Sequence, residues 1–180
     1  MNSNAYEIIG NGKKKIVFIH YFGGDAGSWK WLAKRLAKTH TCYLLNLPGF
    51  NDTELNIEPS IYNYSIFINK QIRLLKLKNY TLCGHSMGGK LALYAALMNQ
   101  VQKPEKIILV APSPATTESM PDEEKKRMLN HPNKSEAIQT VENAIVRKLK
   151  KNKYEYAVDS QLRIHSDAWK WWIETGMNHD

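Results

Sequence analysis

The chain has 180 residues, of which 43% are hydrophobic and 23% are charged. These values are ordinary for one globular domain, so they exclude a wholly disordered chain and a collagen-like fibre. No apolar run approaches the ~20 residues that are needed to cross a bilayer, so we expect no membrane partner.

The 25 basic and 17 acidic residues give a net charge of +8. A basic excess accompanies nucleic-acid binding or anionic substrates in many proteins. Here the basic residues are scattered over residues 13–15, the helical face of Lys30, Lys34 and Lys38, and the run 147–151. No RNA-binding signature accompanies them, so we interpret them as solvated surface and expect no nucleic-acid partner.

Both cysteines, Cys42 and Cys83, lie in apolar, strand-like segments. Two buried thiols are typical of a reducing compartment and form neither a disulfide framework nor a zinc site, so we expect no bound metal. Residues 1–7 lack the charged start and the apolar stretch of a secretory signal. We therefore expect a cytoplasmic protein.

Residues 1–115 alternate short apolar runs with helix-like segments. Runs rich in β-branched and aromatic residues predict an edge strand at 6–9 and buried strands at 16–19, 41–45, 80–83 and 106–110. Apolar residues three and four positions apart predict helices at 28–38, 61–78 and 88–98, the first with Ser28 as its N-cap. This alternation predicts an α/β fold with a doubly wound, mainly parallel sheet.

After residue 115 the pattern changes, because residues 121–180 contain no apolar run of strand type. We expect helices at 121–130, at 135–151 with Ser135 as its cap, and around 168–175. The sequence therefore predicts two parts, a sheet-containing core at 1–115 and a helical cap or lid segment at 116–180.

The most informative segment is G-x-S-x-G, formed by Gly84, Ser86 and Gly88 between a predicted strand and a predicted helix. A tight strand-to-helix turn holds the serine in strained geometry and requires small residues two positions on either side. The same turn directs the first helical N–H groups toward the space above the hydroxyl. The alternative interpretation is a glycine-rich turn with a capping serine.

Three segments occur in the order that is typical of the α/β-hydrolase fold family: residues 19–24, 47–50 and 84–89, which read IHYFGG, LPGF and GHSMGG. Over about residues 6–115 the chain resembles the GHSMGG-type small-molecule serine hydrolases of that family. The resemblance implies Ser86 as the nucleophile and the backbone N–H groups of Phe22 and Met87 as the oxyanion hole. It also implies that His20 braces the oxyanion loop by hydrogen bonds.

The resemblance implies an activity, the hydrolysis of an ester or similar acyl bond in a small molecule, without a metal or organic cofactor. The acyl group would pass through an acyl-enzyme on Ser86. Hydrolysis of C–C bonds and acyl transfer use the same groups, so the substrate and the exact reaction stay open. We interpret His85, Asp25 and the tryptophans Trp169, Trp171 and Trp172 as packing or turn residues.

A serine nucleophile needs a general base and an acid that orients it, and in this family both follow late strands. His131, His165 and His179 lie downstream of Ser86, but none follows a predicted strand. The core therefore resembles a C-terminally incomplete hydrolase, for which three explanations stay open: a truncated product, a chain completed by a partner, or a non-catalytic pseudo-hydrolase that binds a small molecule. A sheet that ends early exposes an apolar edge, which favours self-association.

Overall fold

The computed structural model describes residues 5–99 and 101–180. Five strands form one sheet in the order β1-β3-β2-β4-β5. β2 pairs in parallel with β3 and β4, β4 pairs in parallel with β5, and β1 pairs antiparallel with β3 at the edge. The mainly parallel α/β sheet that the sequence predicts is confirmed. The strands are β1 (Tyr6–Ile9), β2 (Lys14–Ile19), β3 (His40–Leu45), β4 (Tyr80–His85) and β5 (Lys106–Val110).

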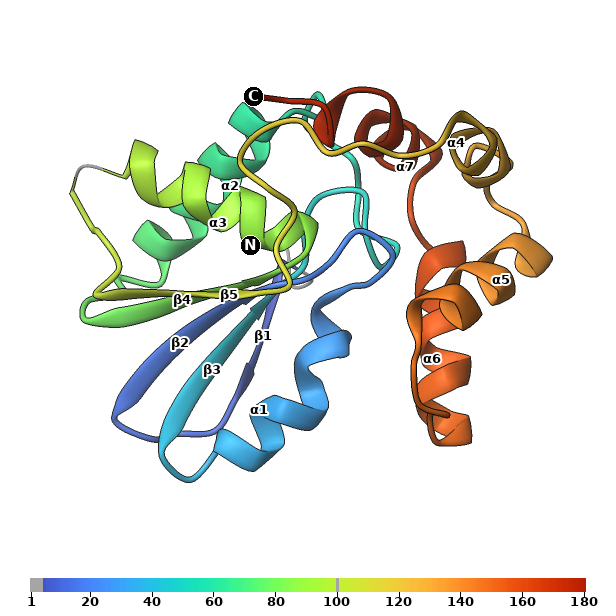
Figure 1. Cartoon of the computed structure of the whole chain (residues 1–180). Helices are drawn as coiled ribbons and strands as arrows, with labels where there is room; N and C mark the ends of the chain where they lie inside the picture. Colours follow the sequence, from blue (N-terminus) through green and yellow to red (C-terminus); the bar gives the residue numbers. More distant parts are fainter. Residues whose placement is uncertain (1–4, 100) are drawn as a thin grey trace.

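Helices cover both faces of the sheet, as expected of a doubly wound fold (Figure 1). The 3₁₀ turn η1 (Ala26–Trp29) and helix α1 (Lys30–Leu36) cover one face, while α2 (Ile61–Leu74) and α3 (Met87–Met98) cover the other. Successive side chains of β2 point to opposite faces of the sheet, as they do in any strand. Phe18 packs with Trp29 and Ala33 on the α1 side, whereas Val17 and Ile19 belong to the larger core beneath α2 and α3.

Two helix caps differ from the sequence-based prediction. The carboxylate of Asp25, and not Ser28, caps the η1 turn by accepting from the Gly27 N–H at 2.8 Å. Ser28 completes the reciprocal pair, because its hydroxyl accepts from the Asp25 N–H at 3.3 Å. At the start of α5, Asn133 takes the place predicted for Ser135. Asp and Asn are strong N-caps, so Asp25 and Asn133, which lie upstream of the predicted serines, cap the two helical segments.

The C-terminal third is helical, as predicted, but its division differs. The expected helix over 135–151 is wrong: α5 ends at Ala144, Ile145 is extended, and α6 begins at Lys151. Four basic residues within 147–151 would repel one another at helical spacing, which disfavours one continuous helix through this run. The helices are α4 (Asp122–Met128), α5 (Lys134–Ala144), α6 (Lys151–Leu162), α7 (Ser166–Trp171) and the π-helical turn η2 (Trp172–Gly176).

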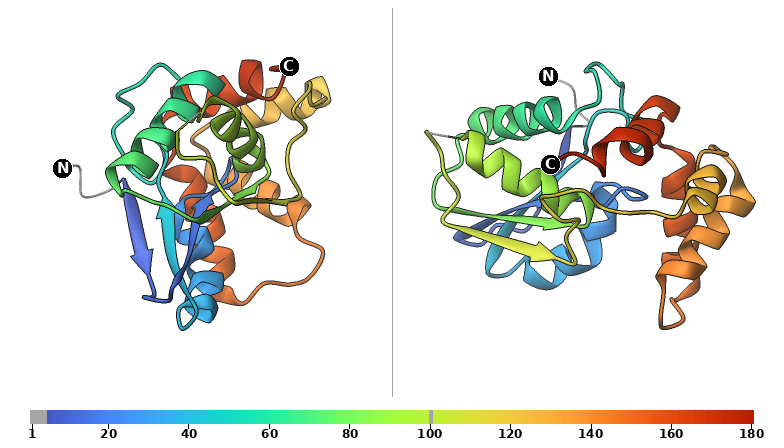
Figure 2. Two further views of the ribbon diagram at one scale, coloured as in Figure 1. Left: turned by 90° about the vertical axis from the view of Figure 1, so that its left-hand side faces the viewer. Right: turned by 45° about the horizontal axis from the view of Figure 1, so that its top comes forward.

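The C-terminal helices lie beyond the carboxyl ends of the parallel strands (Figures 1 and 2). α7 and η2 also pack on the core, since Trp172 and Ile173 share one buried cluster with Tyr64 and Met87. The predicted boundary at residue 115 falls in the connection between β5 and α4. No helix in the described part of the chain is long and apolar enough to span a membrane.

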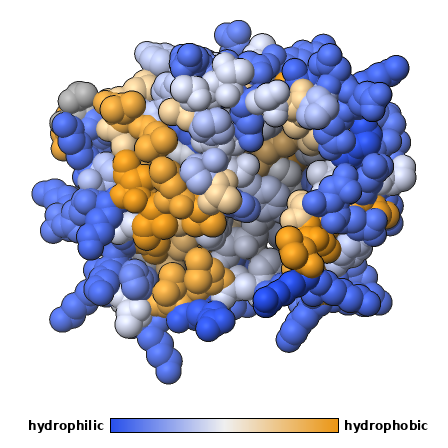
Figure 3. Space-filling view, in the orientation of Figure 1, coloured by the Kyte–Doolittle hydropathy of each residue, from blue (hydrophilic) through white to orange (hydrophobic). Residues whose placement is uncertain are grey.

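One strand edge of the sheet is apolar and uncovered. β5 pairs with β4 on one side only and forms the edge opposite β1. Its four consecutive side chains from Ile107 to Val110 are each 37–45% exposed. Figure 3 shows the hydrophobic residues gathered at the left of this face of the molecule, over β5. The predicted incomplete core corresponds to this edge.

A buried lysine joins α3 to the end of the described chain. The Lys90 ammonium group is fully buried and donates to the carbonyl oxygens of Thr116, Met177 and His179 at 3.1, 3.2 and 2.6 Å. Burial lowers the pKa of Lys90. Since all three acceptors are backbone groups, this one side chain fixes residues 116 and 177–179 against α3, the helix that follows Ser86.

We expect Lys90→Met to lower the free energy of unfolding by about 1–3 kcal/mol, because it removes one donor from each of three carbonyl groups, although the Met177 carbonyl keeps the Glu118 N–H at 2.9 Å. Hydrogen exchange at residues 177–179 should become faster. Urea unfolding and exchange mass spectrometry measure both effects. Leu74→Ala on the exposed surface of α2 is the control and should change stability by less than about 0.5 kcal/mol. Unchanged stability in Lys90→Met would contradict the role given to this side chain.

Candidate active site

Ser86 lies at a sharp turn between β4 and α3. Its φ of 51° places a non-glycine residue at positive φ, a conformation that costs free energy and persists only where the surroundings impose it. Two backbone hydrogen bonds impose it here: the Ser86 N–H donates to Val110 at 3.2 Å, and the Ser113 N–H donates to the Ser86 carbonyl at 3.0 Å. The turn is therefore anchored to the end of β5.

The glycines on either side of Ser86 are required by close backbone contacts. A Cβ atom on Gly84 would lie 2.1 Å from the Gly88 carbonyl oxygen. A Cβ atom on Gly88 would lie 2.5 Å from the carbonyl oxygens of Ile19 and His20 at the end of β2. No side chain fits at these distances. The spacing of the motif thus reflects direct contact among β4, α3 and β2.

The two residues expected to form an oxyanion hole occupy the loop after β2 and the first turn of α3. Among the described residues, neither the Phe22 N–H nor the Met87 N–H donates a hydrogen bond to a protein group. Met87 begins a helix of twelve residues, whose N-terminus carries partial positive charge. The Phe22 ring packs on Trp169 with the ring centroids 4.3 Å apart, which holds the loop against the cap.

His20 is fully buried and connects two loops. Its Nδ1 donates to the Tyr21 carbonyl at 2.9 Å, and its Nε2 accepts from the Leu47 N–H at 3.4 Å. Burial lowers the pKa of His20, which favours the neutral ring that this pairing requires. Because backbone groups engage both nitrogens, His20 has none left for the hydroxyl of Ser86.

A cavity of about 310 Å³ lies between the core and the cap, and Ser86 lines it. We call it the chamber. Its volume is in the range of small-molecule sites, which run from about 300 to 1,000 Å³. The sheet side supplies Tyr21, Phe22, Gly23 and Ser86. The cap side supplies Met128, Thr140, Val141, Ala144, Ile145, Leu149, Ala157, Gln161 and Trp169, of which most are apolar.

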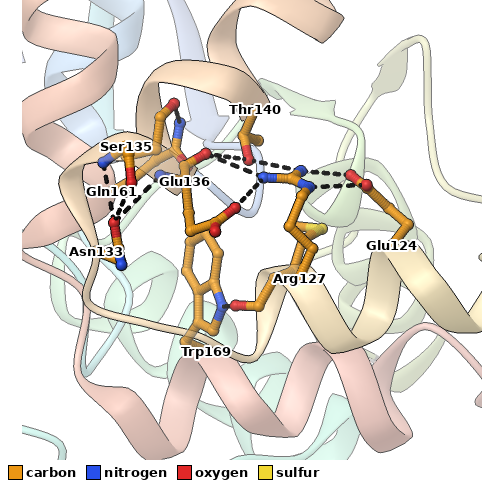
Figure 4. Close-up of polar contacts among 10 residues, drawn as sticks. Glu124, Arg127, Asn133, Ser135, Glu136, Thr140, Gln161 and Trp169 are labelled. Atoms are coloured by element: carbon orange, nitrogen blue, oxygen red, sulfur yellow. Dashed lines mark hydrogen bonds and ion pairs between the residues drawn. The ribbon is translucent and has the colours of Figure 1, made fainter.

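A network around Arg127 holds the cap side of the chamber in place (Figure 4). The guanidinium group bonds the carboxylates of Glu124 and Glu136, each with a contact at 2.9 Å, and the Thr140 hydroxyl at 3.0 Å. The Trp169 indole N–H donates to the Met128 carbonyl at 2.7 Å. These contacts join α4, α5 and α7, each of which contributes a wall of the chamber.

Asp25 links the loop after β2 to the cap. Its carboxylate is fully buried and accepts from the Tyr156 hydroxyl and from Arg163 at 3.0 Å, as well as from the Gly27 N–H. Sequence analysis identified only a turn residue here. The two cap partners lie more than 130 positions along the chain, where no local pattern reveals them.

Four further histidines, all but His40 of those that remain, serve structural contacts. His131 donates to the Ile164 carbonyl at 2.9 Å and stacks on Trp169, and His165 caps α7. His179 lies against a tyrosine ring, and His85 packs between Tyr21 and Trp29. Across residues 5–99 and 101–180, no side chain hydrogen-bonds the Ser86 hydroxyl. The same residues contain no group of three His, Cys, Asp or Glu side chains that could hold a metal ion.

Such a fold, with a strained serine beneath a helical cap, defines the class of α/β hydrolases. The comparison with family models agrees: the α/β hydrolase fold model matches residues 14–138, so the chain belongs to this family. In structure it is similar to an esterase from Exiguobacterium antarcticum, with a TM-score of 0.87 and 19% identity over 97% of this chain and 69% of that one.

Curated relatives are similar over the core. A pimeloyl-[acyl-carrier protein] methyl ester esterase of Aeromonas salmonicida is 32% identical over 99 residues, which is 55% of this chain and 38% of the relative. The uncharacterized hydrolase YugF of Bacillus subtilis is 33% identical over 108 residues, or 57% of this chain and 38% of that protein. The matched regions thus cover less than two fifths of the length of these two relatives.

Stability should depend on pH through three histidines. Burial lowers the pKa of His20, His85 and His131 below 6.5. On acidification these histidines therefore bind protons more readily in the unfolded chain than in the folded chain, which stabilises the unfolded state. We expect the free energy of unfolding to fall as the pH drops from 7.5 through 6.5 to 5.5. Urea unfolding at these three values measures it, and His131→Gln should flatten the dependence. Constant or rising stability on acidification would contradict these shifts.

Proposed function

We propose that this chain carries the nucleophile, the oxyanion-binding groups and the substrate pocket of a serine hydrolase that acts on esters of small molecules. The observation that carries the proposal is the strained turn at Ser86, which opens into a mostly apolar chamber. Backbone strain of this kind clusters at active sites and ligand-binding regions. The similarity to esterases supports the same class of reaction.

In the proposed reaction, the Ser86 oxygen attacks the ester carbonyl carbon and its proton passes to a general base. The oxyanion that develops accepts hydrogen bonds from the N–H groups of Phe22 and Met87, and a donor of this kind contributes about 3–4 kcal/mol in comparable enzymes. The alcohol leaves with a proton, and water then hydrolyses the acyl-serine ester. His20 braces the loop that carries Phe22, and Gly84 and Gly88 permit the turn.

Within residues 5–99 and 101–180 no side chain hydrogen-bonds the Ser86 hydroxyl, so we assign the role of general base to no residue. This same observation favours a second candidate, a non-catalytic protein that binds a small molecule in the chamber. The two candidates share the pocket and differ in whether Ser86 is activated. We propose the cytoplasm as the location, because Cys42 and Cys83 are free and buried thiols.

A fluorophosphonate that labels activated serines separates the two candidates. We expect one adduct on the intact 20.7 kDa chain by mass spectrometry, because the two N–H groups stabilise the negative oxygen of the attacked phosphonate. Ser86→Ala should abolish the adduct. Ser113→Ala, at the neighbouring buried serine, is the matched control and should keep it. No adduct on a folded chain would favour the binding protein.

We also propose that two copies of the chain associate through β5. An edge strand offers unpaired backbone groups, and two identical edges pair about a two-fold axis, which continues the sheet and covers the side chains from Ile107 to Val110.

Ile108→Lys should therefore shift the mass in solution from dimer to monomer, because it places a charge in the contact. Size-exclusion chromatography with light scattering measures the mass. Leu74→Lys, on an exposed position of α2, is the control and should leave the dimer intact. A monomeric parent chain at micromolar concentration would contradict the proposal.

A further inference from the structure

A second hollow, of about 450 Å³, lies between α1 and α6. We call it the α1–α6 groove. The Trp31 ring from α1 meets the Tyr156 ring from α6 edge to face, with the centroids 5.5 Å apart. Tyr21, Leu149 and Ala157 line both this groove and the chamber of Ser86, so the two hollows adjoin.

The charged side chains that line the groove are all cationic. They are Arg35 of α1 and Lys153 of α6, and neither forms an ion pair within the described part of the chain. The Lys153 ammonium group lies 5.1 Å from the centre of the Trp31 ring, which holds it over the groove wall. The buried carboxylate of Asp25 nearby is already paired with Arg163.

The fold brings together two basic segments that lie far apart in the sequence. One is α1, which contributes Arg35, and the other is the first turn of α6, which contributes Lys153. Glu155 is the acid of α6 that pairs within this region, and its partner is Lys151 at 3.8 Å. Sequence analysis interpreted the scattered basic residues of the chain as solvated surface. Arg35 and Lys153, however, line a hollow that adjoins the chamber of Ser86, so their positive charge is available to a ligand there.

We propose that the α1–α6 groove binds the anionic end, a phosphate or a carboxylate, of an amphiphilic ester whose apolar part fills the chamber. The apolar chain gains free energy by leaving water, and the anion gains from two cations that no acid neutralises. A neutral ester would leave both cations without a partner. The proposal deepens the proposed function and rests on it for the reacting end of the ligand.

Binding of octyl phosphate tests the groove without any turnover. Titration calorimetry at 0.15 M salt compares octyl phosphate with octanol and with inorganic phosphate. We expect octyl phosphate to bind about tenfold more tightly than either, since two partly exposed charge contacts of ordinary strength together give about this factor. Phosphatidylglycerol vesicles form a fourth arm, which tests whether a membrane surface is the source of the anion.

The double variant Arg35→Gln/Lys153→Gln should lose about tenfold for octyl phosphate and change less than twofold for octanol. Lys13→Gln/Lys14→Gln removes the same charge at the opposite end of β2 and is the matched control. It should leave the affinity for octyl phosphate within twofold of the parent chain.

Four results would overturn the proposal: equal affinity for octyl phosphate and octanol, equal affinity for inorganic phosphate, an equal loss in the control variant, or binding to vesicles alone. The fluorophosphonate experiment separates this proposal from the proposed function. Preference for octyl phosphate without an adduct at Ser86 would contradict the proposed hydrolase function and support the anion-binding groove. An adduct at Ser86 without preference for octyl phosphate would contradict only the proposal that the groove binds an anion.

Discussion

At Gly84 and Gly88 the backbones of β4, α3 and β2 lie so close that no methyl group fits between them. This contact forces the chain to reverse at Ser86, and the reversal gives that residue its positive φ. The hydroxyl then lies at the carboxyl edge of the sheet, at the start of a helix. The loop after β2 starts beside this reversal, because Gly88 contacts Ile19 and His20 at the end of β2. One steric constraint thus places Ser86 and the loop of Phe22 together.

The cap depends on that edge through a few polar contacts. The buried Asp25 holds α6 by way of Tyr156 and Arg163, and Lys90 holds the chain around residues 177–179. A buried charge that loses its partner is costly, so these contacts resist separation of cap and core. The chamber exists because the cap is held at this distance from Ser86.

The features predicted from the sequence are the local ones. All five strands were predictable, since a β-branched apolar run has to be buried in a sheet, and the turn at Ser86 was predictable because its glycines lie within two residues of it. The pairing of Asp25 with Arg163 was not, because it spans 138 positions and follows from the tertiary fold. The break at Ile145 was also missed, since apolar spacing continues through it while like charges oppose the helix.

The central claim is that the Ser86 hydroxyl, the N–H groups of Phe22 and Met87, and the chamber form one site. A crystal structure with octylboronic acid tests it most directly, because boron bonds to a nucleophilic serine and becomes tetrahedral. The account predicts a bond from boron to the Ser86 oxygen, a boronate oxygen within about 3 Å of both N–H groups, and the alkyl chain inside the chamber. An unmodified Ser86, or a boronic acid bound elsewhere with its chain outside the chamber, would contradict it.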